Sequence, residues 1–287
     1  MGKKKSLSFL IKAEYSKACC YGRSKHADKS AENNYHPYGI YSVKTYENYA
    51  RQGIAFGSWC KEKYGCSTVQ DCKPYVLEYL DYYSNGKSAS SVHTAKYALQ
   101  KLYSISDHEY KVEFKHAKRE RCNITKNRGS IEDVKDFKEE KYNDLLSFAQ
   151  ACGLRRHELL NLRYRDISLD GTGINVVSGK GGKPRHVIIS AKNMELIAGY
   201  AAKAPDPDAY VWNKSQIPSR TPIHRCRRIY AQTLYKNFAR PIEDLPADEQ
   251  YVCRKDKRGV IYDRQAMAIV SLALGHSRLD VIAINYL

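Results

Sequence analysis

The segment Gly179–Lys183 is rich in glycine and lysine, a composition typical of loops that bind phosphate groups. It does not match a nucleotide-binding loop, because the glycine spacing differs, no Ser or Thr follows the lysine, and a strand pattern comes next. Taken alone, the segment is most simply a hairpin turn with solvated lysines. Its chemistry therefore depends on which other residues join it.

Four further short segments carry arginine, histidine or tyrosine, the side chains that bind a phosphate group or attack it. Taken singly, each has a plain structural interpretation. An arginine at a helix start is a surface charge, a lone histidine is a structural residue, and a tyrosine near the end of a chain is a packing residue. In chain order the segments are Gly153-Leu-Arg155-Arg-His-Glu158-Leu, His224-Arg-Cys-Arg227, Leu274-Gly-His276 and Tyr286.

Together, and in this order, the five segments resemble the motifs of the tyrosine recombinase (phage-type integrase) family. The resemblance runs from near Ser42 to the end of the chain and is strongest over residues 148–190 and 219–287. Every motif position carries the residue type that the family uses. The catalytic residues that the resemblance implies are Arg155, Lys180, His224, Arg227, His276 and Tyr286, with Glu158 as a supporting residue.

The resemblance implies cleavage and rejoining of DNA strands without a metal, a cofactor or ATP. Tyr286 would attack the scissile phosphorus and form a 3′-phosphotyrosyl bond. Arg155 and Arg227 would bind the non-bridging oxygens through forked hydrogen bonds that tighten as negative charge builds up. Lys180 would protonate the departing 5′ oxygen.

The two histidines have less defined roles in this scheme. His224 would act as a base or a hydrogen-bond donor, and His276 would donate to a phosphate oxygen. Glu158, one helical turn after Arg155, would orient a cationic side chain.

Several neighbouring residues remain alternatives. Arg156 could replace Arg155, and Lys183 lies on the same turn as Lys180 and could replace it. Tyr286 is favoured as the nucleophile because it follows Leu-Gly-His276 at the distance that the family uses. The rival tyrosines in a chain with 24 of them are Tyr235, Tyr251 and Tyr262. The basic residues predicted to contact the DNA are Lys183, Arg185, Arg225, Arg228, Arg121 and Lys126.

The charge of the chain agrees with a polyanionic partner. The 287 residues carry a net charge of +17, with 23 basic and 12 acidic residues up to position 130 and 25 and 19 after it. Both halves are therefore basic, which favours double-stranded DNA as the partner. No apolar stretch approaches the roughly 18–20 residues of a membrane span, so no membrane partner is expected.

The nine cysteines do not predict a disulfide or zinc framework. Their number is odd, their spacing is irregular and no Cys-x-x-Cys occurs. Cysteines in apolar helical contexts behave as small hydrophobic residues. Cysteine usage of this kind favours a protein of the reducing cytoplasm. A DNA partner would place the protein at the bacterial nucleoid.

The hydrophobic pattern predicts the elements that must position these residues. Helical periodicity begins at Ser42, after Pro74 and near Ser90, and predicts a helical core-binding domain over residues 41–125. Residues 1–40 are expected to form a basic arm or lead-in, and residues 115–130 a basic linker.

The second half is expected to be a mainly helical α+β catalytic domain over residues 130–287. Its pattern predicts a hairpin formed by residues 174–178 and 185–190. It also predicts helices over residues 191–203, 223–238, 263–274 and 279–285.

The resulting hypothesis is a site-specific recombinase that integrates or excises a mobile element. Four protomers on DNA are implied, and accessory proteins that bend DNA or set direction are possible partners. One alternative is a type IB topoisomerase that only relaxes supercoils, and another is a non-catalytic DNA-binding regulator. The chain ends one residue after Tyr286, whereas many family members continue into a C-terminal segment that docks on a neighbouring protomer. Either this protein assembles through another surface, or the sequence is truncated.

Overall fold

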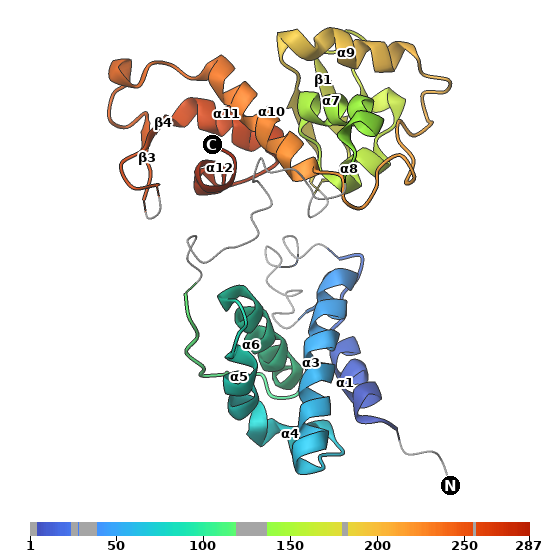
Figure 1. Ribbon diagram of the computed structural model, residues 1–287, viewed down its shortest axis with the longest axis vertical. Helices are drawn as coiled ribbons and strands as arrows, with labels where there is room; N and C mark the ends of the chain where they lie inside the picture. Colours follow the sequence, from blue (N-terminus) through green and yellow to red (C-terminus); the bar gives the residue numbers. More distant parts are fainter. Residues whose placement is uncertain (1–4, 24–27, 29–38, 119–136, 180–182, 255–256) are drawn as a thin grey trace. The chain divides into compact units, whose positions relative to one another are not determined.

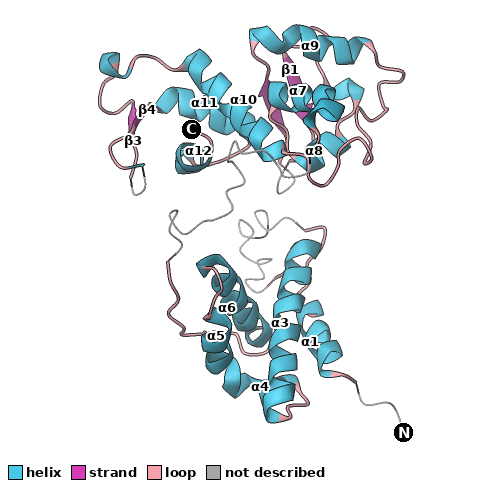
Figure 2. Ribbon diagram, viewed as in Figure 1, coloured by secondary structure: helices cyan, strands magenta, loops and turns pink. Residues whose placement is uncertain are grey.

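The structure is a computed structural model that describes residues 5–23, 28, 39–118, 137–179, 183–254 and 257–287. The chain forms two compact units, Met1–Thr125 and Lys126–Leu287. The structure is mainly helical with two small antiparallel hairpins, as the sequence predicts (Figure 2).

The first unit is built from helices (Figure 1). The long helix predicted from Ser42 is present, with Ser42 as its side-chain N-cap and Gly65 in the left-handed conformation at its C-terminal end. The helices predicted after Pro74 and near Ser90 are also present. In chain order the helices are α1 (Leu7–Ser16), α3 (Val43–Tyr64), α4 (Val69–Cys72), α5 (Val76–Ser84) and α6 (Ala89–Ser104).

Helix α1 lies within residues 1–40, the segment expected to be a basic arm or lead-in. Ser6 caps it, and its buried side chains Ile11 and Tyr15 pack against α3. The contact is close because Gly53 and Gly57 are one turn apart on α3: a Cβ at either position would lie within 3 Å of α1 side chains. This helix was not predicted, and the two glycines on α3 leave room for a short amphipathic helix to pack closely.

The second unit combines helices with one hairpin near its start and one near its end (Figure 1). All four helices predicted after the first hairpin are present. In chain order the helices are α7 (Asn143–Cys152), α8 (Arg156–Asn161), α9 (Ala191–Ala202), α10 (Ile223–Phe238), α11 (Arg264–Leu274) and α12 (Leu279–Asn285).

The first hairpin pairs β1 (Gly173–Val176) with β2 (Arg185–Ile188), and Ile174 lies opposite Val187. This is the hairpin that the alternating pattern predicts. The second hairpin pairs β3 (Gln250–Val252) with β4 (Ile261–Asp263). It was not predicted, because strands of three residues are too short to show an alternation.

The core of the second unit is apolar and aromatic. Phe148 on α7 is fully buried, and its ring makes edge-to-face contacts with Tyr200 and Trp212, with centroids 4.7 and 5.6 Å apart. Such contacts add to the free energy of burial. They hold α7 against α9, and α7 also packs on α10.

Within the described part of the chain, no single helix is both long and apolar enough to cross a membrane. The bent pair α11 and α12 reaches that length and composition only when its two helices, 89° apart, are taken together.

Candidate active site

The loop between α7 and α8 positions Arg155. Gly153 ends α7 in the left-handed conformation, with φ 59°, and a Cβ there would lie 2.4 Å from the ring of Tyr230. Glycine is therefore needed both for the turn and for the close approach of α10. The turn leaves Arg155 at the N-cap of α8, half-buried and directed into the unit.

A carboxylate, Glu158, organises two arginines. Its Oε1 accepts a hydrogen bond from Nη1 of Arg155 at 2.8 Å, and its Oε2 accepts one from the backbone N–H of Arg155 at 2.7 Å. Arg185 at the start of β2 donates to both carboxylate oxygens, at 2.8 and 2.7 Å. Burial alone would raise the pKa of Glu158, but the hydrogen bonds from Arg185 and Arg155 outweigh it and lower this pKa to about 2.

The C-terminal end of α11 is the second organising feature of the site. The carbonyl oxygen of Ala273 accepts a hydrogen bond from Nε of Arg185 at 2.9 Å. The carbonyl oxygen of Leu274 accepts one from Arg155 at 3.1 Å and another from Arg227. The last carbonyls of a helix lack partners within the helix and carry partial negative charge. They therefore gather three guanidinium groups from three different segments.

Arg227 lies on α10 and is almost fully buried, with 1% of its surface exposed. Its guanidinium donates to the carbonyl oxygens of Gly153 and Leu274 and, through Nε, to the hydroxyl oxygen of Tyr286 at 3.2 Å. Burial lowers the pKa of Arg227, because the charged form loses hydration. An arginine ordinarily titrates so far above neutral pH that the group stays charged.

Tyr286 follows α12, and two side chains from other elements contact its hydroxyl group. One is Arg227, and the other is His276, whose Nε2 lies 3.2 Å from the hydroxyl oxygen. His276 comes directly after Gly275, which ends α11 in the left-handed conformation. Three separate segments, α10, the end of α11 and the end of α12, therefore meet at one phenol oxygen.

The other predicted catalytic residues lie as follows. His224 is in the first turn of α10, and its side chain is exposed. Lys180 lies outside the described residues, as do Arg121 and Lys126. The described ends of the Lys180 turn are held together, because the N–H of Gly179 donates to the carbonyl oxygen of Lys183 at 2.9 Å.

Two arginines predicted to contact DNA have partners within the protein. Arg185 is the ion-pair partner of Glu158, and only 8% of its side chain is exposed. Arg225 is buried and forms an ion pair with Glu139. Lys183 is exposed, and Arg228 is half-buried on α10.

The role of Arg185 was missed, although the sequence contains a signal for it. Arg185, Val187 and Ile189 alternate along one strand, and the structure buries the last two. A period of two therefore puts Arg185 on the buried face, where a charge needs a partner.

The rival tyrosines are engaged in packing around the second hairpin. The hydroxyl oxygen of Tyr235 accepts a hydrogen bond from the N–H of Asp263 at 2.9 Å, and its ring packs edge-to-face on Tyr262. Tyr251 lies on β3 opposite Tyr262. Tyr286 differs from these residues because its hydroxyl group contacts an arginine and a histidine.

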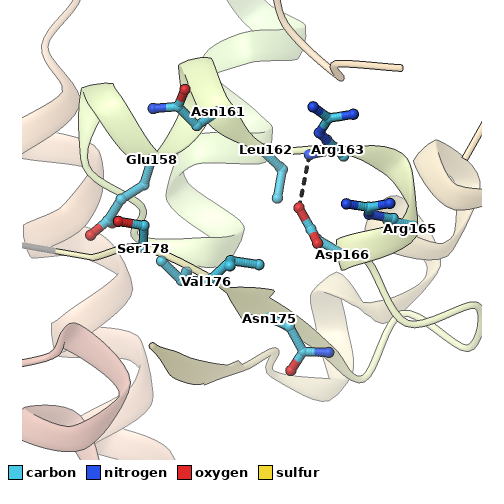
Figure 3. Close-up of a pocket in the computed structure, with 10 residues that line it drawn as sticks. Glu158, Asn161, Leu162, Arg163, Arg165, Asp166, Asn175, Val176 and Ser178 are labelled. Carbon is cyan, nitrogen blue, oxygen red and sulfur yellow. Dashed lines mark hydrogen bonds between the residues drawn. The ribbon is translucent and has the colours of Figure 1, made fainter. Parts of the chain in front are cut away.

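A pocket of about 360 Å³ lies beside Glu158, between α8 and β1. Figure 3 shows Glu158 at one end and Arg163 and Arg165 at the other, with the carboxylate of Glu158 directed away from them. Arg163 and Arg165 both form ion pairs with Asp208. Both arginines of this pocket thus have a carboxylate partner, whereas Arg227, which contacts Tyr286, donates to neutral carbonyl and hydroxyl oxygens.

Among the residues that the structure describes, no group of three or more His, Cys, Asp or Glu side chains could hold a metal ion. The eight cysteines in the described ranges are free thiols.

The chain is similar to several known proteins. Residues 130–248 match the model of the phage integrase family. A tyrosine recombinase of Pseudothermotoga lettingae is 26% identical over 157 residues, which are 54% of this chain and 52% of that protein. The chain thus spans about half the length of this curated relative.

Solved structures show the same fold. The XerH site-specific recombinase, bound to a palindromic difH substrate in a post-cleavage complex, matches with a TM-score of 0.59 and 14% identity. The match covers 98% of this chain and 90% of that one. The Tn1549 transposon integrase, in complex with circular intermediate DNA, matches with a TM-score of 0.50 and 12% identity, over 96% and 94% of the two chains.

The family match begins just before α7 and includes Arg155, Glu158 and Arg227, while His276 and Tyr286 join them from beyond it in the fold. The motifs, the fold and the curated relative thus agree: residues 130–248 carry a phage integrase family domain, and the chain is similar to tyrosine recombinases, which are enzymes that cleave and rejoin DNA.

Proposed function

We propose that this chain is a site-specific DNA recombinase that acts through a 3′-phosphotyrosyl intermediate on Tyr286 and integrates or excises a mobile element. The observation that carries the proposal is the contact of the Tyr286 hydroxyl group with Arg227 and His276. A phenol has an ordinary pKa near 10, so it needs a cation or a base nearby before it attacks a phosphodiester at neutral pH.

The proposed chemical step replaces one phosphodiester bond with another and needs no cofactor. The hydroxyl oxygen of Tyr286 forms a bond to the scissile phosphorus as the bond from phosphorus to the 5′ oxygen breaks. Nε2 of His276 lies 3.2 Å from the phenol oxygen, so it can accept the phenol proton in its neutral form. Attack by a 5′ hydroxyl group reverses the step and releases Tyr286.

Stabilisation of the transition state falls to the two arginines. Arg155 and Arg227 share the carbonyl oxygen of Leu274, so their guanidinium groups converge on one point. A phosphorane carries more negative charge on its oxygens than the ground state does, and preorganised donors stabilise it selectively. Lys180 supplies the proton for the leaving 5′ oxygen, and His224 serves as a further donor.

The partners follow from the same proposal. The helical unit binds the recombination site, and the unit with Tyr286 cuts it. Exchange between two duplexes takes four protomers, with accessory proteins to bend DNA or to set direction. The solved XerH and Tn1549 integrase structures contain DNA, which supports DNA as the partner here. The reaction would take place at the nucleoid, in a reducing cytoplasm.

The test is a suicide-substrate assay with nicked duplexes that carry the ends of the element encoding this chain. The protein is incubated with the DNA in the presence of a chelator, and covalent products are separated on a denaturing gel. Wild type is compared with Tyr286→Phe and with the matched control Tyr262→Phe. A shifted band that is lost in Tyr286→Phe and kept in Tyr262→Phe is the expected result.

Two results would contradict the proposal. DNA binding on the correct site without any covalent band would favour a non-catalytic regulator. A Tyr286-dependent band accompanied by supercoil relaxation, but by no exchange between two marked sites, would favour a topoisomerase.

A further inference from the structure

Gln232 on α10 is hydrogen-bonded to the residue that carries the proposed nucleophile. Its Nε2 donates to the backbone carbonyl oxygen of Tyr286 at 3.1 Å. Arg227, five residues earlier on the same helix, donates to the hydroxyl oxygen of Tyr286. One helix therefore holds Tyr286 at both its side chain and its backbone.

A second tether reaches the same helix from a different element. Nζ of Lys257, in the loop between β3 and β4, donates to the carbonyl oxygen of Ala283 at 2.9 Å. Ala283 is in the last turn of α12, where carbonyl groups lack partners within the helix. Lysine near a helix C-terminus can bind these carbonyls and also interacts favourably with their partial charge.

The hydrogen bonds from Gln232 and Lys257 reach the C-terminal end of α12, where few backbone hydrogen bonds stabilise the helix. The helix is only seven residues long, and the N–H groups of Tyr286 and Leu287 both donate to the carbonyl oxygen of Ile282. So short a helix is marginal unless other elements hold it. The position of the phenol oxygen therefore depends on contacts from outside α12.

We propose that Gln232 and Lys257 are positioning residues, which fix the end of α12 so that the phenol oxygen of Tyr286 stays beside Arg227. The inference rests on the proposed function of Tyr286. The hydrogen bonds that carry this inference go to backbone carbonyl oxygens of Tyr286 and Ala283. Their effect is to keep the nucleophile within reach of the phosphorus, where an error of about 1 Å can cost about 100-fold in rate.

The experiment measures covalent-bond formation in a single turnover on the nicked duplex, over a range of DNA concentrations. It yields the limiting rate and the half-saturating DNA concentration for each variant. Gln232→Leu removes the amide donor at nearly constant volume. Asn285→Ala is the matched control, because Asn285 donates to the carbonyl oxygen of Val281 within α12 alone. Lys257→Met is the second test, with Lys257→Arg to restore a donor.

The expected result is a limiting rate about 10- to 100-fold below wild type in Gln232→Leu and Lys257→Met. The half-saturating DNA concentration should stay within threefold of wild type, because substrate binding is not their role. Lys257→Arg should recover part of the lost rate, and Asn285→Ala should remain within threefold of wild type. A residue that matters only for folding would not produce this split between rate and saturation.

A limiting rate in Gln232→Leu and Lys257→Met equal to that of Asn285→Ala would overturn this inference and leave the proposed function intact. If Gln232→Leu does not fold, the two Lys257 variants decide alone, and equal rates in both would overturn it. The absence of a Tyr286-dependent product from wild type would instead overturn the proposed function and this inference with it.

Discussion

Nε of Arg227 lies 3.2 Å from the hydroxyl oxygen of Tyr286, although 59 positions separate the two residues in the chain. The same guanidinium binds two backbone carbonyl groups, of Gly153 and Leu274. It thus joins the turn after α7, the end of α11 and Tyr286. The N–H donors of a guanidinium lie in one plane and point in different directions, so one side chain can make all three contacts. An ammonium group is a compact point charge and cannot reach all three acceptors.

Arg227→Lys should therefore lose both stability and rate. Buried acceptors left without a donor cost about 1–3 kcal/mol each, so we expect the free energy of unfolding to fall by about 2–4 kcal/mol. The limiting rate of covalent-bond formation should fall by at least about 100-fold, as expected for the loss of a preorganised donor. Urea unfolding and the single-turnover assay measure the two effects. Lys236→Ala, at an exposed position on the same helix, serves as the control and should change neither.

Glu158→Gln tests the buried carboxylate. Because the pKa of Glu158 is lowered to about 2 in the folded protein, its ionised form stabilises the fold at pH values above its unfolded pKa of about 4.3. That contribution, about 3 kcal/mol at neutral pH, is lost as the pH falls from about 4.3 to about 2. Wild type should thus exceed Glu158→Gln in stability at pH 7, and the difference should shrink on acidification.

Urea unfolding between pH 7 and pH 3 measures this difference. Glu195→Gln is the matched control, since Glu195 is exposed on α9, and it should show no such pH dependence. A gap between wild type and Glu158→Gln that stays constant with pH would contradict the ionic role of Glu158.

Arg185→Lys tests the contacts through which this residue orients Glu158. An ammonium group cannot bind both oxygens of Glu158 and the carbonyl oxygen of Ala273 at once. The limiting rate should therefore fall by about 10- to 100-fold, because Arg155 loses the orientation that Glu158 gives it. The salt dependence of DNA binding should not change in this variant under either role of Arg185. If Arg185 contacts a phosphate group, lysine keeps the charge; if Arg185 is buried in an ion pair, it releases no counterions.

Arg185→Met and Lys183→Met complete this test. A DNA-contacting cation contributes about one unit to the slope of log affinity against log salt concentration. Lys183→Met, at an exposed position, should lower that slope by about one. Arg185→Met should leave it unchanged; a decrease of one unit would show that Arg185 contacts DNA after all.

The sequence predicts which side chains form the candidate site. Arg155, Arg227, His276 and Tyr286 lie in short segments whose spacing matches the family, and the structure brings these four together. The acceptors that gather the arginines could not be predicted. They are backbone carbonyl groups of Ala273 and Leu274, which every residue type provides, so the sequence carries no sign of them.

The fold, too, could be predicted only in part. Long amphipathic segments such as α3 and α10 have enough turns for their period to be recognised. The three-residue strands β3 and β4 are too short for that. Helix α1 was missed because its signal lies partly in another segment, in the two glycines of α3 that receive it.

Gly57→Ala should destabilise the first unit. A Cβ at Gly57 would lie 2.5 Å from Cδ1 of Ile11, so this side chain or helix α1 would have to shift. Overpacking of this kind costs about 1–3 kcal/mol, which exceeds the gain of about 0.5–1 kcal/mol that alanine brings within a helix. Gly199→Ala on α9 is the matched control, because a Cβ there meets nothing within 4 Å, and it should stabilise the protein. Urea unfolding followed by circular dichroism measures both variants. Equal stabilisation by the two substitutions would show that α1 does not pack closely against Gly57 in solution.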